Sequence, residues 1–312
     1  MAVALTAAIA FLLLSSLYFR NVAAFFAALF SFVPLILFYL QYGLRIYLAG
    51  GAVLSIAFFL LLGPDEGVVL SLTYLMSSAL MGEMIRRNRP VEQAVFPAIL
   101  PPLISGFGLW FYQAWREKTE PVAYFHGLIL NNLNETVNYY EKLGWDKEKI
   151  ALLKSSLPDM ATVMLSIFPG MFICSMILTL FLNYLLVRMV LARKENPAPF
   201  EFQLLTRWTV ADIWVWGFIA SLASLMVPYG PLRVAGGNFL LLFFLVYFFQ
   251  GMAALADYFK KKSVPFSWQA ISWVFLLVWP FPVLGWMAVF ILGLADVWVD
   301  FRKIREASRS SK

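Results

Sequence analysis

The chain has 312 residues, of which 62% are apolar and only 13% are charged, with a mean hydropathy of +0.77 and a net charge of +6. Water-soluble domains are about 45–50% apolar and about 25% charged, so the composition excludes a soluble globule and indicates an integral membrane protein. The positive charge does not indicate nucleic acid as a partner, because the Lys and Arg residues stand in short runs beside apolar segments. That pattern is typical of a membrane surface, and the expected partner is the lipid bilayer.

Most enzyme and metal chemistry is also excluded. The chain has one cysteine, Cys174, and one histidine, His126, so an intramolecular disulfide and a multi-ligand Cys or His zinc site cannot form. The phosphate-binding loop, the dinucleotide-binding glycine motif and the nucleophile elbow of α/β-hydrolases are absent from the sequence. We therefore expect no metal, no cofactor and no catalytic residues.

The fold class expected is all-α, a polytopic bundle of about eight to ten membrane-spanning helices. A bilayer core about 30 Å thick is crossed by roughly 20 apolar residues in a helix. Apolar stretches between charges occur at approximately 2-19, 22-42, 46-62, 67-85, 94-114, 160-190, 211-228, 234-258, 268-281 and 283-299. The last two meet at two prolines, Pro280 and Pro282, so 268-299 is either a hairpin of short helices or a re-entrant pair. The first carries no Lys or Arg at its start, which favours a retained span over a cleaved signal peptide.

The distribution of Lys and Arg predicts the orientation. With ten crossings, 16 of the 24 basic residues fall on one face and eight on the other, and six of those eight lie in the long segment 115-159. Since long loops count little in the positive-inside rule, both termini are expected in the cytoplasm. The expected location is a bacterial inner membrane. The cytoplasmic set is Arg45, Arg86, Arg87, Arg89, Arg188, Arg193, Lys194, Arg207, Lys260, Lys261, Lys262, Arg302, Lys303, Arg305, Arg309 and Lys312.

The charges also divide the chain into four parts: a membrane bundle 1-114, an external segment 115-159, a second bundle 160-300 and a basic tail 301-312. Within 115-159, apolar residues from Val122 to Leu143 recur at three- and four-residue steps, which predicts an amphipathic helix ending at Gly144. Asp146 is expected to cap a second helix, which should end before Pro158. The pair either lies on the membrane and the other spans, or forms a lid over an outward-facing pocket.

Ionisable residues near the ends of spans are candidate sites, because a charge inside a membrane is costly. One hypothesis is a buried ion-pair cluster of Arg188 with Asp257 and Asp296. The alternative is that the acidic residues, Glu83 among them, reach water or pair with nearby cations. Those cations are Arg87, Lys260 and Arg302.

Three polar residues lie deeper in the predicted spans: Asn183, Asn238 and Gln250. Side chains of this kind commonly form hydrogen bonds between helices, and less often they contact a ligand. Gly236 and Gly237, directly before Asn238, predict either a close approach of two helices or a break in the helix.

Several motifs resemble the YybS-like family of bacterial multi-pass membrane proteins, a domain of unknown function. They are the runs that begin at Gly251 and Gly293, Phe168-Pro-Gly, Asn183-Tyr184, Pro199-Phe200, and Trp208 with Asp212 and Trp216. The resemblance covers nearly the whole chain and transfers no activity. Around Trp208 the chain has Thr209-Val210, where the family pattern would place a proline before the acidic residue.

The N-terminal spans are remotely similar to the substrate-binding components of energy-coupling-factor transporters. This similarity implies a helical bundle that binds a small solute and docks on an energising membrane module through small residues of its first helix, here Ala4 and Ala8. The leading functional hypothesis is therefore a small-solute-binding or transport component without its own ATPase. The alternative is a non-transporting scaffold whose basic loops recruit a cytoplasmic envelope or signalling partner. An intramembrane enzyme ranks third, because the acidic residues lie near the ends of the spans.

Overall fold

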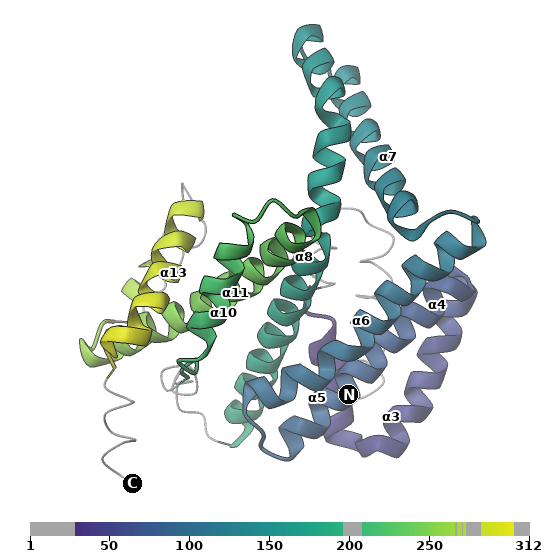
Figure 1. Ribbon diagram of the computed structural model, residues 1–312. Helices are drawn as coiled ribbons and strands as arrows, with labels where there is room; N and C mark the ends of the chain where they lie inside the picture. The colour runs from purple at the N-terminus through teal and green to yellow at the C-terminus, as the bar shows by residue number, and fades with distance from the viewer. Residues whose placement is uncertain (1–28, 196–207, 266, 270, 273–281, 303–312) are drawn as a thin grey trace. The chain divides into compact units, whose positions relative to one another are not determined.

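The computed structural model of the chain describes residues 29–195, 208–265, 267–269, 271–272 and 282–302 (Figure 1). Within those ranges the secondary structure is helical and contains no strand, which confirms the all-α prediction. The helices are α3 (Phe32–Leu62), α4 (Pro64–Leu70), η1 (Ser71–Met76), α5 (Ser77–Arg86), α6 (Val91–Arg116), α7 (Pro121–Lys142), α8 (Lys147–Glu195), α10 (Trp214–Ser224), α11 (Gly230–Lys261) and α13 (Pro282–Val299).

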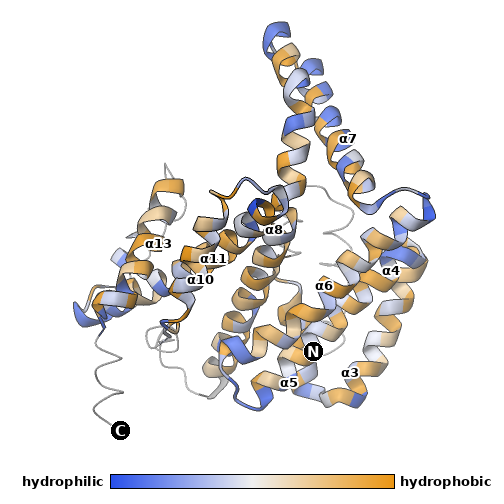
Figure 2. Ribbon diagram, in the orientation of Figure 1, coloured by the Kyte–Doolittle hydropathy of each residue, from blue (hydrophilic) through white to orange (hydrophobic). Residues whose placement is uncertain are grey.

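Five helical segments of the described chain are long and apolar enough to cross a membrane: Phe32–Leu62, Pro64–Arg86, Val91–Arg116, Lys147–Ala192 and Gly230–Lys261. Two shorter apolar helices, Trp214–Ser224 and Val283–Val299, accompany them. Large apolar side chains face outward on these elements; Leu60 is 80% exposed and Phe96 is 71% exposed. Figure 2 shows the same helices as mainly hydrophobic along their length, with hydrophilic residues gathered at their ends. An exposed apolar surface of this extent fits contact with lipid.

The chain groups into two compact units. The first contains the described residues of 1–165 and 175–198, and the second contains 166–174 and the described residues of 199–312. The long helix α8 contributes to both. The predicted division at 114, 159 and 300 concerns which parts lie in the membrane, and it stays a prediction.

A sharp turn inside α3 shapes the first unit. Gly43 has φ 74° and ψ 175°, so the helical path breaks there, between the predicted stretches 22-42 and 46-62. Positive φ is costly for a residue with a Cβ, and glycine therefore suits the position. After Pro64 the chain passes through α4 and the π-helical turn η1, where the Tyr47 hydroxyl donates to the carbonyl oxygen of Leu75 at 2.8 Å.

The segment after α6 forms a helical hairpin from α7 and the N-terminal part of α8 (Figure 1). Val137, Ile150 and Leu157 form its buried core. Gly144 has φ 81° and ends the turn after α7, and the Asp146 carboxylate accepts a hydrogen bond from the Glu148 amide at 2.9 Å. The amphipathic helix and both predicted capping residues are confirmed.

The predicted end before Pro158 is wrong, because α8 continues unbroken to Glu195. Proline removes one backbone hydrogen bond from a helix interior. Leu157 and Ala161, on either side of Pro158, are 2% and 0% exposed, so packing on both sides of the proline offsets that loss.

The second unit contains α10, α11, α13 and residues 166–174 of α8. Glycines set the separation of its helices. A Cβ on Gly251 would collide with the Val289 carbonyl oxygen, and one on Gly293 would collide with the Tyr247 carbonyl oxygen, so α11 and α13 touch backbone to backbone. Gly236 likewise lies against Ser224 of α10. Of the two alternatives for this glycine pair, a helix break is wrong, since α11 is continuous there. Close approach is confirmed at Gly236, whereas a Cβ on Gly237 would meet nothing within 4 Å.

Candidate functional site

A buried ion pair joins the end of α13 to α11. The Asp296 Oδ2 atom accepts hydrogen bonds from Nη2 and Nε of Arg302 at 2.7 and 3.2 Å, and both side chains are 1% exposed. The same oxygen accepts from Nε2 of Gln250 at 3.0 Å. Gln250 Oε1 then accepts from the Val210 amide at 3.0 Å, and Nη1 of Arg302 donates to the Trp208 carbonyl oxygen at 2.8 Å.

Local backbone geometry brings these groups together. Asp300 has φ 46°, so the chain reverses at the end of α13 and returns Arg302 to Asp296, six residues earlier in the sequence. The Gly251–Gly293 crossing brings α11 close enough for Gln250 to reach the same carboxylate. Among the described residues the second oxygen of Asp296, Oδ1, has no hydrogen-bond partner. The network therefore ties α11, α13 and the segment 208–210 into one unit.

The three members of the predicted ion-pair cluster have different partners. Arg188 belongs to the first unit, where its Nη1 atom donates to Asn88 Oδ1 at 3.3 Å. Asp296 pairs with Arg302, and Asp257 pairs with Lys261 one turn along α11 at 2.8 Å. Neither unit contains all three, so the cluster is not a site of either unit.

The alternative of neighbouring cations is confirmed for two acidic residues. Glu83 pairs with Arg86 at 2.6 Å and with Arg87 at 2.7 Å, and its carboxylate also accepts from the Tyr39 hydroxyl at 2.7 Å. Asp296 pairs with Arg302, but in a buried position rather than at a hydrated surface. The arrangement differs from the expectation because the turn at Asp300 takes Arg302 back into the helix interface.

Asn238 and Asn183 make interhelical hydrogen bonds, each inside one unit. Asn238 Oδ1 accepts from the Gly170 amide at 2.5 Å, and its Nδ2 donates to the Ser166 carbonyl oxygen at 2.7 Å. Asn183 Oδ1 accepts from the Val33 amide at 3.0 Å, and its Nδ2 donates to the Leu29 carbonyl oxygen at 2.7 Å. Both amides thus satisfy backbone groups of a neighbouring helix or helix end, the more common role of such residues.

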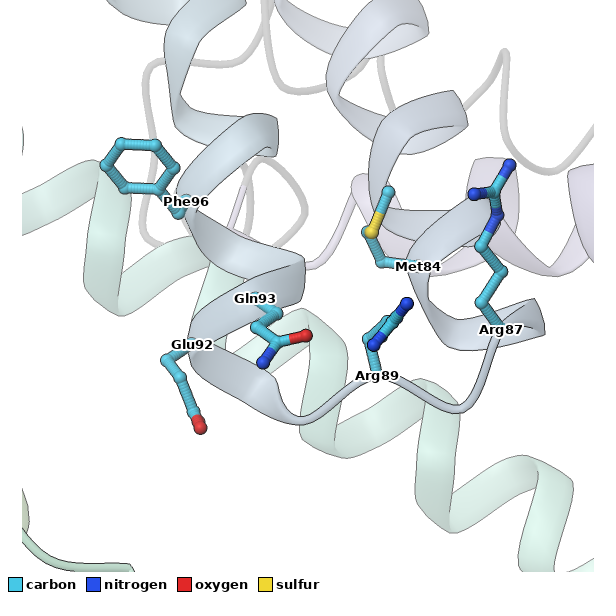
Figure 3. A pocket seen from close by; sticks show the side chains of 6 residues that line it. All are labelled: Met84, Arg87, Arg89, Glu92, Gln93 and Phe96. Carbon is cyan, nitrogen blue, oxygen red and sulfur yellow. The ribbon is translucent and has the colours of Figure 1, made fainter.

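A pocket of about 590 Å³ opens in the first unit, where α5 meets α6. Its lining residues are Met84, Arg87, Arg89, Glu92, Gln93 and Phe96 (Figure 3). The loop from Arg87 to Pro90 is held by hydrogen bonds from α8: Arg188 to the Asn88 side chain, and the Tyr184 hydroxyl to the Arg89 carbonyl oxygen at 2.9 Å. Arg87 is paired with Glu83, whereas the Arg89 side chain makes no hydrogen bond or ion pair with any described residue.

Other predicted site residues give no further cluster. Within the described residues, His, Cys, Asp and Glu side chains form no group of three that could hold a metal ion, and Cys174 is a half-buried free thiol. Ala4, Ala8 and the tail from residue 303 lie outside the described residues. Sequence reasoning missed the role of Trp208, Val210 and the two crossing glycines. The signal available was the repeated pattern of Gly, Ala and Asp in the motifs that begin at Gly251 and Gly293.

Helices with lipid-type surfaces, joined by internal polar contacts, define a polytopic integral membrane protein. The family described as "Predicted membrane protein (DUF2232)" matches residues 7–297, and the chain belongs to this family. Searches of the curated proteins and of the solved structures give no significant match. The class expected from composition is therefore confirmed as a membrane protein of a family without an assigned activity.

Proposed function

We propose that this protein is a non-transporting membrane scaffold. The observation that supports it is that the three deep polar residues, for which ligand contact was the less common alternative, all take part in helix packing. Asn183 and Asn238 bind backbone groups of neighbouring elements, and Gln250 joins the Asp296–Arg302 pair. A solute-binding component needs such groups to face a pocket. No enzymatic activity is part of the proposal.

The recruiting surface that we propose is the run Lys260–Lys262 at the end of α11, which is called the lysine run below. It lies at the same end of the second unit as the end of α13, where Arg302 is fixed by its contacts with Asp296 and Trp208 (Figures 1 and 2). A basic surface on rigid helices suits an acidic cytoplasmic protein, since complementary charge steers association. The cytoplasmic side is assigned by the Lys and Arg count in short loops.

A bundle of eight to ten spans in a bacterial inner membrane, with both termini in the cytoplasm, is part of the proposal. In the first unit, Arg86 lies over the ring of Tyr39, close to the turn at Gly43. Arg116 pairs with Asp65 at 2.9 Å, close to the next turn of the chain at Gly63. These contacts support a topology in which successive turns of the chain, at Gly43 and at Gly63, lie at opposite ends of the membrane-spanning helices. The YybS-like assignment is part of the same proposal, whereas the remote similarity to transporter components belongs to the competing function.

The competing function is the solute-binding component that docks on an energising module through Ala4 and Ala8. Substituting the buried asparagines separates the two functions. The variants are Asn183→Leu and Asn238→Leu, with Asn134→Leu as the matched control, because Asn134 donates only to the Leu130 carbonyl oxygen of its own exposed helix. Unfolding temperature and native mass spectra are recorded for each purified protein.

A scaffold predicts that both buried variants lower the unfolding temperature relative to the control, and that the wild type retains no specific small molecule other than membrane lipid. A solute-binding component predicts a retained small molecule that is lost in Asn183→Leu or Asn238→Leu without loss of stability. As a second criterion, replacing the lysine run by Gln should release a protein partner from the scaffold. If Ala4→Trp with Ala8→Trp releases the partner instead, the scaffold proposal fails.

A further inference from the structure

The pocket between α5 and α6 combines features that a phosphate group requires. Its loop connects two candidate membrane spans, Pro64–Arg86 and Val91–Arg116, and a loop that joins two spans is expected at the membrane surface. Arg89 is exposed and makes no hydrogen bond or ion pair with a described residue. Guanidinium groups bind phosphate through two parallel hydrogen bonds, and an unpaired one in a pocket is available for such binding.

The backbone around Arg89 is fixed before any ligand arrives. Its amide donates to the Met84 carbonyl oxygen at 2.9 Å, and its carbonyl oxygen accepts from Tyr184 at 2.9 Å. Asn88, with φ 52°, closes the turn and is itself bound by Arg188. A side chain on a fixed loop loses less freedom on binding than one on a mobile loop.

Helix α6 supplies further donors. It begins at Val91, after Pro90, and the first-turn amides of a helix have no partner within the helix, which favours an anion there. Figure 3 shows the Gln93 side chain extending towards Arg89, whereas the Glu92 carboxylate points away from both arginines. The positive side of the pocket is therefore Arg89 together with the start of α6.

The opposite wall is apolar and faces outward. Phe96, one turn further along α6, is 71% exposed, and Met84 lines the same pocket. A free phosphate or an acidic peptide does not need an apolar wall that continues along a membrane span. A phospholipid needs both parts, with its phosphate at the interface and its acyl chain along the span.

We propose that this pocket binds an anionic phospholipid, with its phosphate on Arg89 and its acyl chain against Phe96. This inference goes beyond the scaffold function, because it concerns a different unit and a different partner from the lysine run.

The test measures binding of phosphatidylglycerol to the purified full-length protein in nanodiscs of zwitterionic lipid. The variants are Arg89→Gln and Phe96→Ala, with Arg86→Gln as the matched control. Arg86 is close in sequence, carries the same charge, lies outside the pocket and pairs with Glu83. We expect Arg89→Gln to weaken binding at least about tenfold beyond the change in the control, since a charged hydrogen-bonded contact is lost. The unfolding temperature of Arg89→Gln should equal that of the wild type.

Phe96→Ala should weaken phosphatidylglycerol binding but leave any competition by inorganic phosphate unchanged. Equal losses in Arg89→Gln and Arg86→Gln would show general attraction of a negative surface and would overturn the site. Full displacement of the lipid by millimolar inorganic phosphate, or by an acidic peptide, with no effect of Phe96→Ala, would overturn the lipid as the ligand.

Discussion

Asp296 binds Arg302 through a single carboxylate oxygen, which accepts from both Nη2 and Nε of the guanidinium group. Both side chains are 1% exposed, so the pair has almost no contact with solvent. Because Asp300 turns the chain back after α13, this contact fixes the end of the helix against α11 and the Trp208 carbonyl oxygen. The C-terminal motif of the sequence thus has a structural role in the second unit.

The glycine crossing that supports this pair can be tested by adding single methyl groups. Gly251→Ala and Gly293→Ala place a Cβ against carbonyl oxygens of the facing helix, and overpacking of this kind costs about 1–3 kcal/mol. Gly237→Ala, also on α11, meets nothing within 4 Å and should leave stability unchanged or raise it by up to about 1 kcal/mol. Unfolding temperatures in detergent compare the three. Equal values for all three variants would mean that α11 and α13 do not touch at these glycines.

The hairpin of α7 and α8 is expected to depend on its own small core. Leu157→Ala removes a side chain that is 2% exposed and should cost about 2–5 kcal/mol of local stability. Leu152→Ala, five residues earlier and 72% exposed, is the matched control. Limited proteolysis between residues 121 and 165 should be faster in Leu157→Ala alone. Similar cleavage rates in both variants would show that the hairpin has no packed core.

Orientation can be tested with single cysteines in a Cys174→Ala background. An impermeant thiol reagent should label Lys142→Cys in intact cells, because the hairpin is expected outside, and Lys261→Cys only after permeabilisation. Lys142 and Lys261 are both exposed, so a difference in labelling reports the side of the membrane. Labelling of Lys261→Cys in intact cells would reverse the proposed orientation.

The sequence predicted features that depend on nearby residues. The helix of the hairpin, its stop at Gly144 and the cap at Asp146 follow from spacing and local chemistry, and the structure confirms them. The continuation through Pro158 was not predictable in this way, because packing of Leu157 and Ala161 decides it.

Partners distant in sequence were equally hidden. Periodicity places Asn183 in a span but does not show that its amide binds Val33, 150 residues earlier. Arg302 is close to Asp296 in sequence and was one of the cations expected to pair with an acidic residue, but its burial depends on the turn at Asp300, which charge counting does not show. The all-α membrane class of the protein can therefore be predicted from composition and hydropathy, whereas the partners of its charged residues depend on the fold.

Polar groups inside the bundle hold its helices together. A double-mutant cycle with Asp296→Asn, Arg302→Met and the double variant tests this claim most directly, with unfolding free energy in detergent as the readout and Asp257→Asn as the control. Asp257 pairs with Lys261, which is 53% exposed, and such pairs contribute about 0–1 kcal/mol.

Asp296→Asn removes the carboxylate charge that Arg302 contacts in the buried interface, so it should cost about 3–5 kcal/mol. The double variant should cost clearly less than the sum of the two single variants, because removing both partners leaves no unpaired buried charge. Additive losses in the cycle, with Asp296→Asn no more costly than Asp257→Asn, would contradict the claim.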